Sequence, residues 1–140
     1  MRLLKSQRGQ AMAEMAIVLP ILVFLLLGIL TTGIAINSKI AVSGAAREAA
    51  RNYAINQSDS LARDTAETFL RGSVASSITE FSSHFDKLSD VTIGVQGDYV
   101  TVQVTYHQPS YVPLLPVFLG GSAWGNTFNL TSSATFKIEQ

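Results

Sequence analysis

Residues 15–36 read MAIVLPILVFLLLGILTTGIAI and carry no charged side chain. As an α-helix, which rises 1.5 Å per residue, this run is about 33 Å long. The hydrocarbon core of a bilayer is about 30 Å thick, so the run is long enough to cross it. The sequence therefore predicts one membrane-spanning helix near the N-terminus, and about 100 residues remain for a single small domain.

The composition of the chain excludes several classes of function. Its 140 residues include 10 Lys or Arg and 10 Asp or Glu, so the formal net charge is zero and no nucleic-acid partner is expected. The chain has no cysteine, which excludes disulfides and thiolate metal sites. Neither His84 nor His107 has a nucleophile at a catalytic spacing. We therefore expect no enzyme activity, no metal and no cofactor.

The charges on either side of the apolar run predict its orientation. The segment before the run is basic and holds no acid: Arg2, Lys5 and Arg8. After the run, Glu48 partly balances Arg47 and Arg51. The positive-inside rule therefore places the N-terminus in the cytoplasm and the rest of the chain outside it.

Glu14 lies at the entrance of the apolar run, where an unpaired carboxylate costs at least about 2.5–3.5 kcal/mol. In one interpretation, Glu14 is simply solvated at the level of the lipid headgroups. In the other, Gly9 and Glu14 form a processing motif, because a basic leader, a glycine and a glutamate five residues later resemble the cleavage site of type IV pilin-like precursors. Cleavage after Gly9 makes Gln10 the new N-terminus, and its ammonium can then pair with Glu14 of a neighbouring subunit.

Two segments carry a resemblance to a known family. The sequence EMAIVLP, residues 14–20, and the leucine-rich run after it resemble the TadE-like family of minor pilins, or pseudopilins, of tight-adherence (Tad) pili. The sequence AAREAARNYA, residues 45–54, is similar to the alanine–arginine helix that follows the membrane span in that family. A weaker similarity lies in the final SATFKIE, residues 133–139.

The resemblance implies a non-enzymatic envelope protein that is cut by a prepilin peptidase and takes part in assembling a Tad pilus or its priming or tip complex. It implies a place in the inner membrane, with the C-terminal domain outside the cytoplasm, or in the extracellular pilus. The implied partners are other pilin and pseudopilin subunits, the peptidase, the inner-membrane assembly platform and membrane lipid. The alternative is a membrane-anchored binding module, or a module secreted by signal-peptide cleavage after Ala35, that is not built into a pilus.

The chain divides into four predicted segments: a cleaved cytoplasmic leader at 1–9, a membrane or pilus-core helix at 10–37, an alanine-rich helical extension at 38–57 and an extracytoplasmic domain at 58–140. Pro20 cannot donate a hydrogen bond to the carbonyl of Ala16, so a kink or a loosened turn is expected there.

The alanine-rich extension carries small side chains at helical spacing, including Ala46 and Ala49. Such a stripe either lets a helix of another subunit approach closely or packs on the chain's own outer domain. Arg47 and Arg51 lie on one face of the same helix, and Glu48 can reach Arg51. The processing residues that we predict are Gly9 and Gln10, and the assembly residues are Glu14, Pro20, Ala46, Arg47, Ala49 and Arg51.

The remaining sequence predicts a small α+β domain. Ser60 is expected to cap a second helix with an apolar side made of Leu61, Thr65, Phe69 and Val74. Phe81 and Phe85 indicate a short third helix. Alternating apolar residues predict strands at 91–95, 100–106 and 128–138, with a turn at 97–98.

The fold class that we predict is therefore α+β, with a long N-terminal transmembrane helix followed by one or two helices and a three- to four-stranded antiparallel sheet. The apolar, proline-rich loop at 109–121 is expected to pack on the chain's own core or on a partner.

Overall fold

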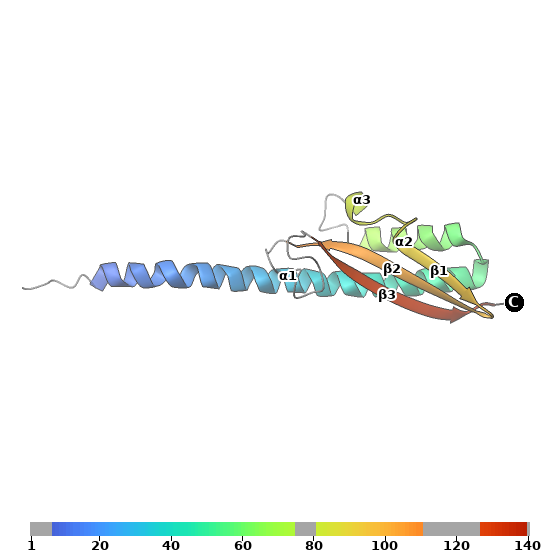
Figure 1. Cartoon of the computed structure of the whole chain (residues 1–140), viewed down its shortest axis with the longest axis horizontal. Helices are drawn as coiled ribbons and strands as arrows, with labels where there is room; N and C mark the ends of the chain where they lie inside the picture. The colour runs from blue at the N-terminus through green and yellow to red at the C-terminus, as the bar shows by residue number, and fades with distance from the viewer. Residues whose placement is uncertain (1–6, 75–80, 111–126, 140) are drawn as a thin grey trace, which may run out of the picture.

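The computed structural model describes residues 7–74, 81–110 and 127–139. Its elements are the helices α1 (Gln7–Asn56), α2 (Asp59–Ser73) and α3 (Phe81–His84) and the strands β1 (Val91–Gln96), β2 (Tyr99–Pro109) and β3 (Thr127–Lys137). The strands form one antiparallel sheet in the order β1-β2-β3. Figure 1 shows α1 as a long rod whose C-terminal half carries α2 and the sheet. The predicted α+β class is confirmed.

Helix α1 is continuous over 50 residues and includes Pro20. Figure 1 shows no sharp bend near its N-terminal third, so the loss of one backbone hydrogen bond at Pro20 does not interrupt the helix. The predicted segments at 10–37 and 38–57 are therefore parts of one helix that ends at Asn56.

Burial along α1 changes at Thr31. Each residue from Gly9 to Leu30 is exposed or half-buried, whereas Thr31 and Ala35 are buried. The free part of the helix is about 33 Å long, close to the thickness of a bilayer core. The domain therefore starts directly where a membrane-spanning helix would end, within the apolar run rather than after residue 37.

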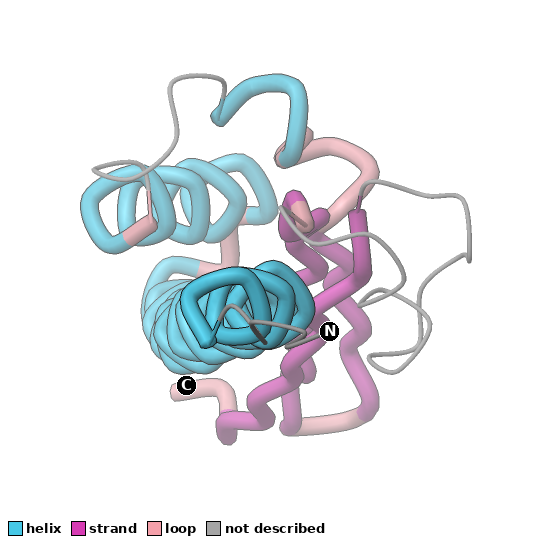
Figure 2. The backbone as a smooth tube through the Cα atoms, turned by 90° about the vertical axis from the view of Figure 1, so that its left-hand side faces the viewer, coloured by secondary structure: helices cyan, strands magenta, loops and turns pink. Residues whose placement is uncertain are grey.

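The alanine-rich part of α1 lies in the core of the domain. Its buried members are Ala41, Val42, Ala45, Ala46, Ala49, Ala50 and Ala54. They belong to one cluster with Leu70 of α2 and with Val102 and Tyr106 of β2. Figure 2 looks along α1 and shows α2 against one side of it and the sheet against another. Of the two interpretations of the alanine stripe, the structure therefore shows packing on the chain's own domain.

Helix α2 differs from the prediction at its start and in its buried side. It begins at Asp59, and Ser58 at the N-cap makes no side-chain capping bond. The buried residues of the helix are Ala62, Ala66 and Leu70. Leu61 and Phe69 keep 43% and 38% of their surface exposed, so their placement on the buried side was wrong. Alanines on α1 bring α2 so close that small residues fit the contact better than large ones.

The sheet shows the alternation that the sequence predicts. Val100, Val102, Val104 and Tyr106 of β2 are all buried on the face toward α1. Gly97 has a φ of +58° and Asp98 does not have a positive φ, the pattern of a type II′ hairpin turn between β1 and β2. β3 runs along α1, where Lys39 donates to the carbonyl of Thr131. The amide of Glu139 donates to the carbonyl of Ala54 over 3.0 Å.

Side chains of α2 hold the segment that leads into β1. The guanidinium of Arg63 donates to the carbonyls of Lys87 and Val91 over 2.9 and 2.5 Å. The Lys87 ammonium contacts the carboxylate of Asp64 at 2.6 Å, which raises the pKa of Lys87 above its usual 10.5. Because the folded pKa is raised, this contribution to stability is complete below pH 10.5 and is lost as the pH rises through the higher value.

The end of α1 offers a stabilising substitution. Gln57 has a φ of +49°, and its amide donates to the carbonyl of Tyr53 over 2.8 Å. A left-handed conformation costs a residue with a Cβ atom about 1–2 kcal/mol, whereas glycine adopts it freely. We expect Gln57→Gly to raise the free energy of unfolding of the domain by about 0.5–1 kcal/mol.

The measurement is urea unfolding of the full chain in detergent micelles. The matched control is Asn56→Gly, one residue earlier and inside the helix, which should be neutral or destabilising because glycine lowers helix propensity. A lower midpoint for Gln57→Gly than for the unsubstituted chain would contradict the expectation.

Candidate functional site: the uncovered surface of the long helix

The N-terminal part of α1 holds the predicted processing and assembly residues on one exposed helix. Gly9, Gln10 and Glu14 are all exposed. The side-chain amide of Gln10 donates to Oε1 of Glu14 over 3.1 Å. Among the side chains that the structure describes, none forms an ion pair with Glu14. This hydrogen bond does not neutralise the Glu14 carboxylate, so Glu14 still requires a cation if it enters hydrocarbon.

The helix beyond Glu14 is apolar on every side. Its large exposed side chains include Met15, Ile17, Leu19, Ile21, Leu22, Phe24, Leu25, Leu26 and Ile29. Helix α1 is long and apolar enough to cross a membrane, which indicates a membrane anchor. A surface of this kind is stable only in lipid or against other apolar helices.

Above the membrane-spanning part, one face of α1 remains uncovered. Ile36 and Ile40 keep 58% and 67% of their surface exposed. Further along the same face, Arg47 and Arg51 are exposed. Neither arginine forms an ion pair within the described residues, and the predicted contact between Glu48 and Arg51 is not formed. Two unpaired guanidinium groups therefore lie about one helical turn apart on this face.

A groove runs between α1 and α2 beside Arg47, and we call it the α1–α2 groove. The ring of Phe69 lies over Gly44 so closely that a Cβ there would be 2.6 Å from the ring. A hollow of about 510 Å³ on one side of the ring includes Ile40 and Arg47, and another of about 380 Å³ includes Glu48 and Leu61. The groove was not predicted from the sequence, because Leu61 and Phe69 were expected on the buried side of the helix. The pattern Ala62, Ala66, Leu70 is the signal that identifies the true buried side.

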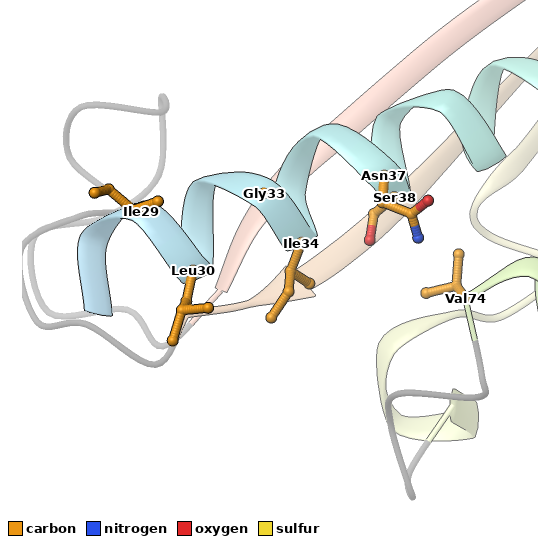
Figure 3. A pocket seen from close by; sticks show the side chains of 7 residues that line it. All are labelled: Ile29, Leu30, Gly33, Ile34, Asn37, Ser38 and Val74. Carbon is orange, nitrogen blue, oxygen red and sulfur yellow. The ribbon is translucent and has the colours of Figure 1, made fainter. Parts of the chain in front are cut away.

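A further hollow of about 450 Å³ lies at the boundary between the free helix and the domain. Figure 3 shows Leu30 and Ile34 extending from the same side of α1, with Val74 at the end of α2 near Asn37 and Ser38. Leu30 and Ile34, which line this hollow, lie near the C-terminal end of the predicted membrane span. This hollow and the α1–α2 groove meet at Asn37 of α1, which borders both.

The structure does not gather the predicted residues into one site within a single chain. Ala46 and Ala49 lie in the core, whereas Arg47 and Arg51 lie on the uncovered face. Glu14 and Arg47 are separated by about 50 Å along α1, as the helical rise of 1.5 Å per residue requires. Contacts between these two charges are therefore possible only between different chains.

His107 takes part in contacts of the sheet. His107 contacts Oδ1 of Asn129 at 2.7 Å and Oδ1 of Asp90 at 3.1 Å, an arrangement that joins β2 to β3 and to the segment before β1. Within the described residues, no group of three or more His, Asp or Glu side chains is placed to hold a metal ion. Most of the predicted loop at 109–121 lies outside the described residues, and Pro109 is the last residue of β2.

One comparison with known proteins gives a match, over the part of the chain that carries this surface. The family model described as TadE-like protein matches residues 9–51, which covers the free helix and most of the alanine-rich part of α1. The resemblance to the TadE-like family is therefore confirmed over these residues. TadE-like proteins form a structural, non-enzymatic family, and the match indicates a protein associated with Tad pili and with pilus-related partners. No curated protein and no solved structure matches the chain.

Proposed function

We propose that this chain is a minor pilin, or pseudopilin, of a Tad-type type IV pilus. The observation that carries the proposal is the free part of α1, in which each residue from Gly9 to Leu30 is exposed or half-buried and Glu14 has no ion-pair partner among the described side chains. A plain membrane anchor needs the apolar surface but gains nothing from the charge, which costs free energy in lipid. A subunit that leaves the membrane for a bundle of helices can use both.

Processing after Gly9 by a prepilin peptidase is part of the proposal. Helix α1 begins at Gln7, so the bond between Gly9 and Gln10 lies in its first turn, where backbone hydrogen bonding is incomplete. A peptidase must unwind that turn, and glycine makes unwinding easier because it is a poor helix former. The cut would make Gln10 the N-terminus and Glu14 the fifth residue of the mature subunit.

The proposed location is the inner membrane, crossed once, with the domain outside the cytoplasm, followed by transfer into the pilus. The proposed partners are other pilin and pseudopilin subunits, the peptidase and the inner-membrane assembly platform. The mature subunit would take part in pilus assembly, or in its priming or tip complex, and support adhesion to surfaces.

The N-terminal residue of the membrane-extracted protein tests this function. We expect Gln10 at the N-terminus of the mature protein. Met1 would indicate an unprocessed anchor, and Ile36 would indicate a secreted domain cut after Ala35. Either of these results would favour the alternative, an extracytoplasmic binding module that is not built into a pilus.

Gly9→Val should block processing while leaving membrane insertion intact. A β-branched side chain at this position is expected to clash in an active site that accepts an extended glycine. On a gel, the variant should run as a precursor about nine residues longer than the mature protein. Gly28→Val is the matched control, because Gly28 lies in the same helix with open space around it and should mature normally. Normal maturation of Gly9→Val would contradict the processing assignment.

A further inference from the structure

We infer that the α1–α2 groove receives the Glu14 segment of a second copy of this chain, and that Arg47 supplies the cation for that carboxylate. The inference rests on the proposed function and deepens it by naming the partner surface. The Arg47 guanidinium then pairs with Glu14 in place of the N-terminal ammonium of Gln10 that the sequence suggested.

Charge complementarity is the first argument. Glu14 has no ion-pair partner among the described side chains, and Arg47 and Arg51 have none either. Asp64, which also borders the groove, already contacts Lys87 at 2.6 Å. Glu48 is the remaining acid of the groove, and Arg47 is the cation among its described lining residues, without an ion-pair partner among the described side chains. An arginine is suited to this role because its planar group can donate two parallel hydrogen bonds to one carboxylate.

The second argument is the order of apolar groups around the charges. In the groove, Phe69 lies between the hollow that includes Arg47 and the hollow that includes Leu61, and both apolar side chains remain partly exposed. On the N-terminal helix, Ile17 and Val18 lie about one turn from Glu14 on the same face, with 68% and 52% of their surface exposed. Burying exposed aliphatic side chains against an aromatic ring is favourable because it removes apolar surface from water. Each surface therefore offers one charge of opposite sign beside exposed apolar side chains.

The third argument is the displacement that this contact requires. Glu14 of one copy meets Arg47 of another when the first copy is displaced outward by about 50 Å along the helix axis. Two copies anchored in the same bilayer have Glu14 at the same height, so they cannot form this contact. A copy that has moved out of the membrane onto a growing fibre can form it. The groove is therefore a contact of the assembled state and not of the membrane-anchored state.

Exchange of the two charges tests the pair in cells that assemble the pilus. We expect Glu14→Arg and Arg47→Glu each to lower recovery in sheared surface material by at least tenfold. The double variant with both substitutions should regain most of the wild-type recovery. Arg47→Gln should also lower recovery, and wild-type recovery of Arg47→Gln would overturn the inference.

Cysteine cross-linking provides the second measurement, and the absence of native cysteine makes it specific. Ala11→Cys combined with Ser43→Cys should form a disulfide-linked dimer in the sheared material and not in the membrane fraction. Ala11→Cys with Ile55→Cys is the matched control, since Ile55 is more exposed than Ser43 but lies about 18 Å further along the helix.

If Glu14→Arg is not processed, the cross-linking result tests the groove contact without it. Sheared material that contains the Ala11→Cys, Ser43→Cys protein without the dimer would overturn the groove contact and leave the proposed function standing. Absence of the wild-type protein from sheared material would instead count against the proposed function itself.

Discussion

Glu14→Gln should leave the protein made, inserted and cut after Gly9, but should keep it in the inner membrane and out of the assembled pilus. Glutamine keeps the shape and polarity of the side chain and removes the charge. A neighbour's cation that pairs with Glu14 then stays buried without a counterion. Removing one member of a buried ion pair costs about 3–5 kcal/mol. This corresponds to a loss of roughly two to three decades in the association constant.

The measurement is fractionation of sheared surface material against membranes for the wild type and Glu14→Gln in parallel. Gln10→Met is the matched control, because it removes the 3.1 Å hydrogen bond from the Gln10 side chain to Glu14 and keeps the charge of Glu14. The control should reach the sheared fraction once its N-terminal processing has been checked. Unfolding of the domain should be unchanged in both variants, since Glu14 lies in the free part of α1. Equal recovery of wild type and Glu14→Gln would refute the pairing mechanism, whichever cation is involved.

The sequence predicted the elements whose signals are local and strong. The run at 15–36 is uncharged and long enough to cross a bilayer core, so a membrane-spanning helix was predicted from its length and composition. The valines at 100, 102 and 104 alternate with polar residues, and their spacing fixes which face of β2 is buried. The turn at Gly97 follows because glycine adopts a positive φ without strain.

The sequence did not predict which face of α2 is buried. Leu61 and Phe69 look like core residues by their size, yet the core takes Ala62 and Ala66 because they allow close approach to the alanines of α1. This preference depends on the partner helix, and within α2 only the helical spacing of Ala62, Ala66 and Leu70 indicates it. The burial that begins at Thr31 also depends on tertiary contacts, since residues 31–36 are apolar enough to belong to either environment.

The same difficulty explains why the α1–α2 groove was not predicted. A groove depends on two helices at once, and its residues are spread from Ile40 to Phe69 in the sequence. The arginines at 47 and 51 were identified from their spacing, but the expected contact with Glu48 does not form. The assembly role of these arginines stays a prediction, and their spacing alone does not give the surface on which they would act.

Ala49→Leu should strongly destabilise the domain. The side chain of Ala49 has no exposed surface and belongs to the cluster that α1 forms with α2 and the sheet. A leucine there must displace packed neighbours, and overpacking of a core typically costs about 1–3 kcal/mol. We expect a loss near the upper end of this range, about 3 kcal/mol, because the site lies on the close contact between packed elements. In urea, the unfolding midpoint should fall by about 1–2 M.

Arg51→Leu is the matched control, because it places the same side chain two residues away on the uncovered face of the same helix. Its unfolding midpoint should stay close to that of the wild type, because residue 51 is exposed and the new side chain displaces no packed neighbour. If the alanine stripe instead served contacts between subunits, Ala49→Leu would leave the midpoint unchanged and impair assembly alone. The two substitutions therefore separate the two sides of one helix: the buried alanines that hold the domain on α1, and the exposed arginines on the uncovered face.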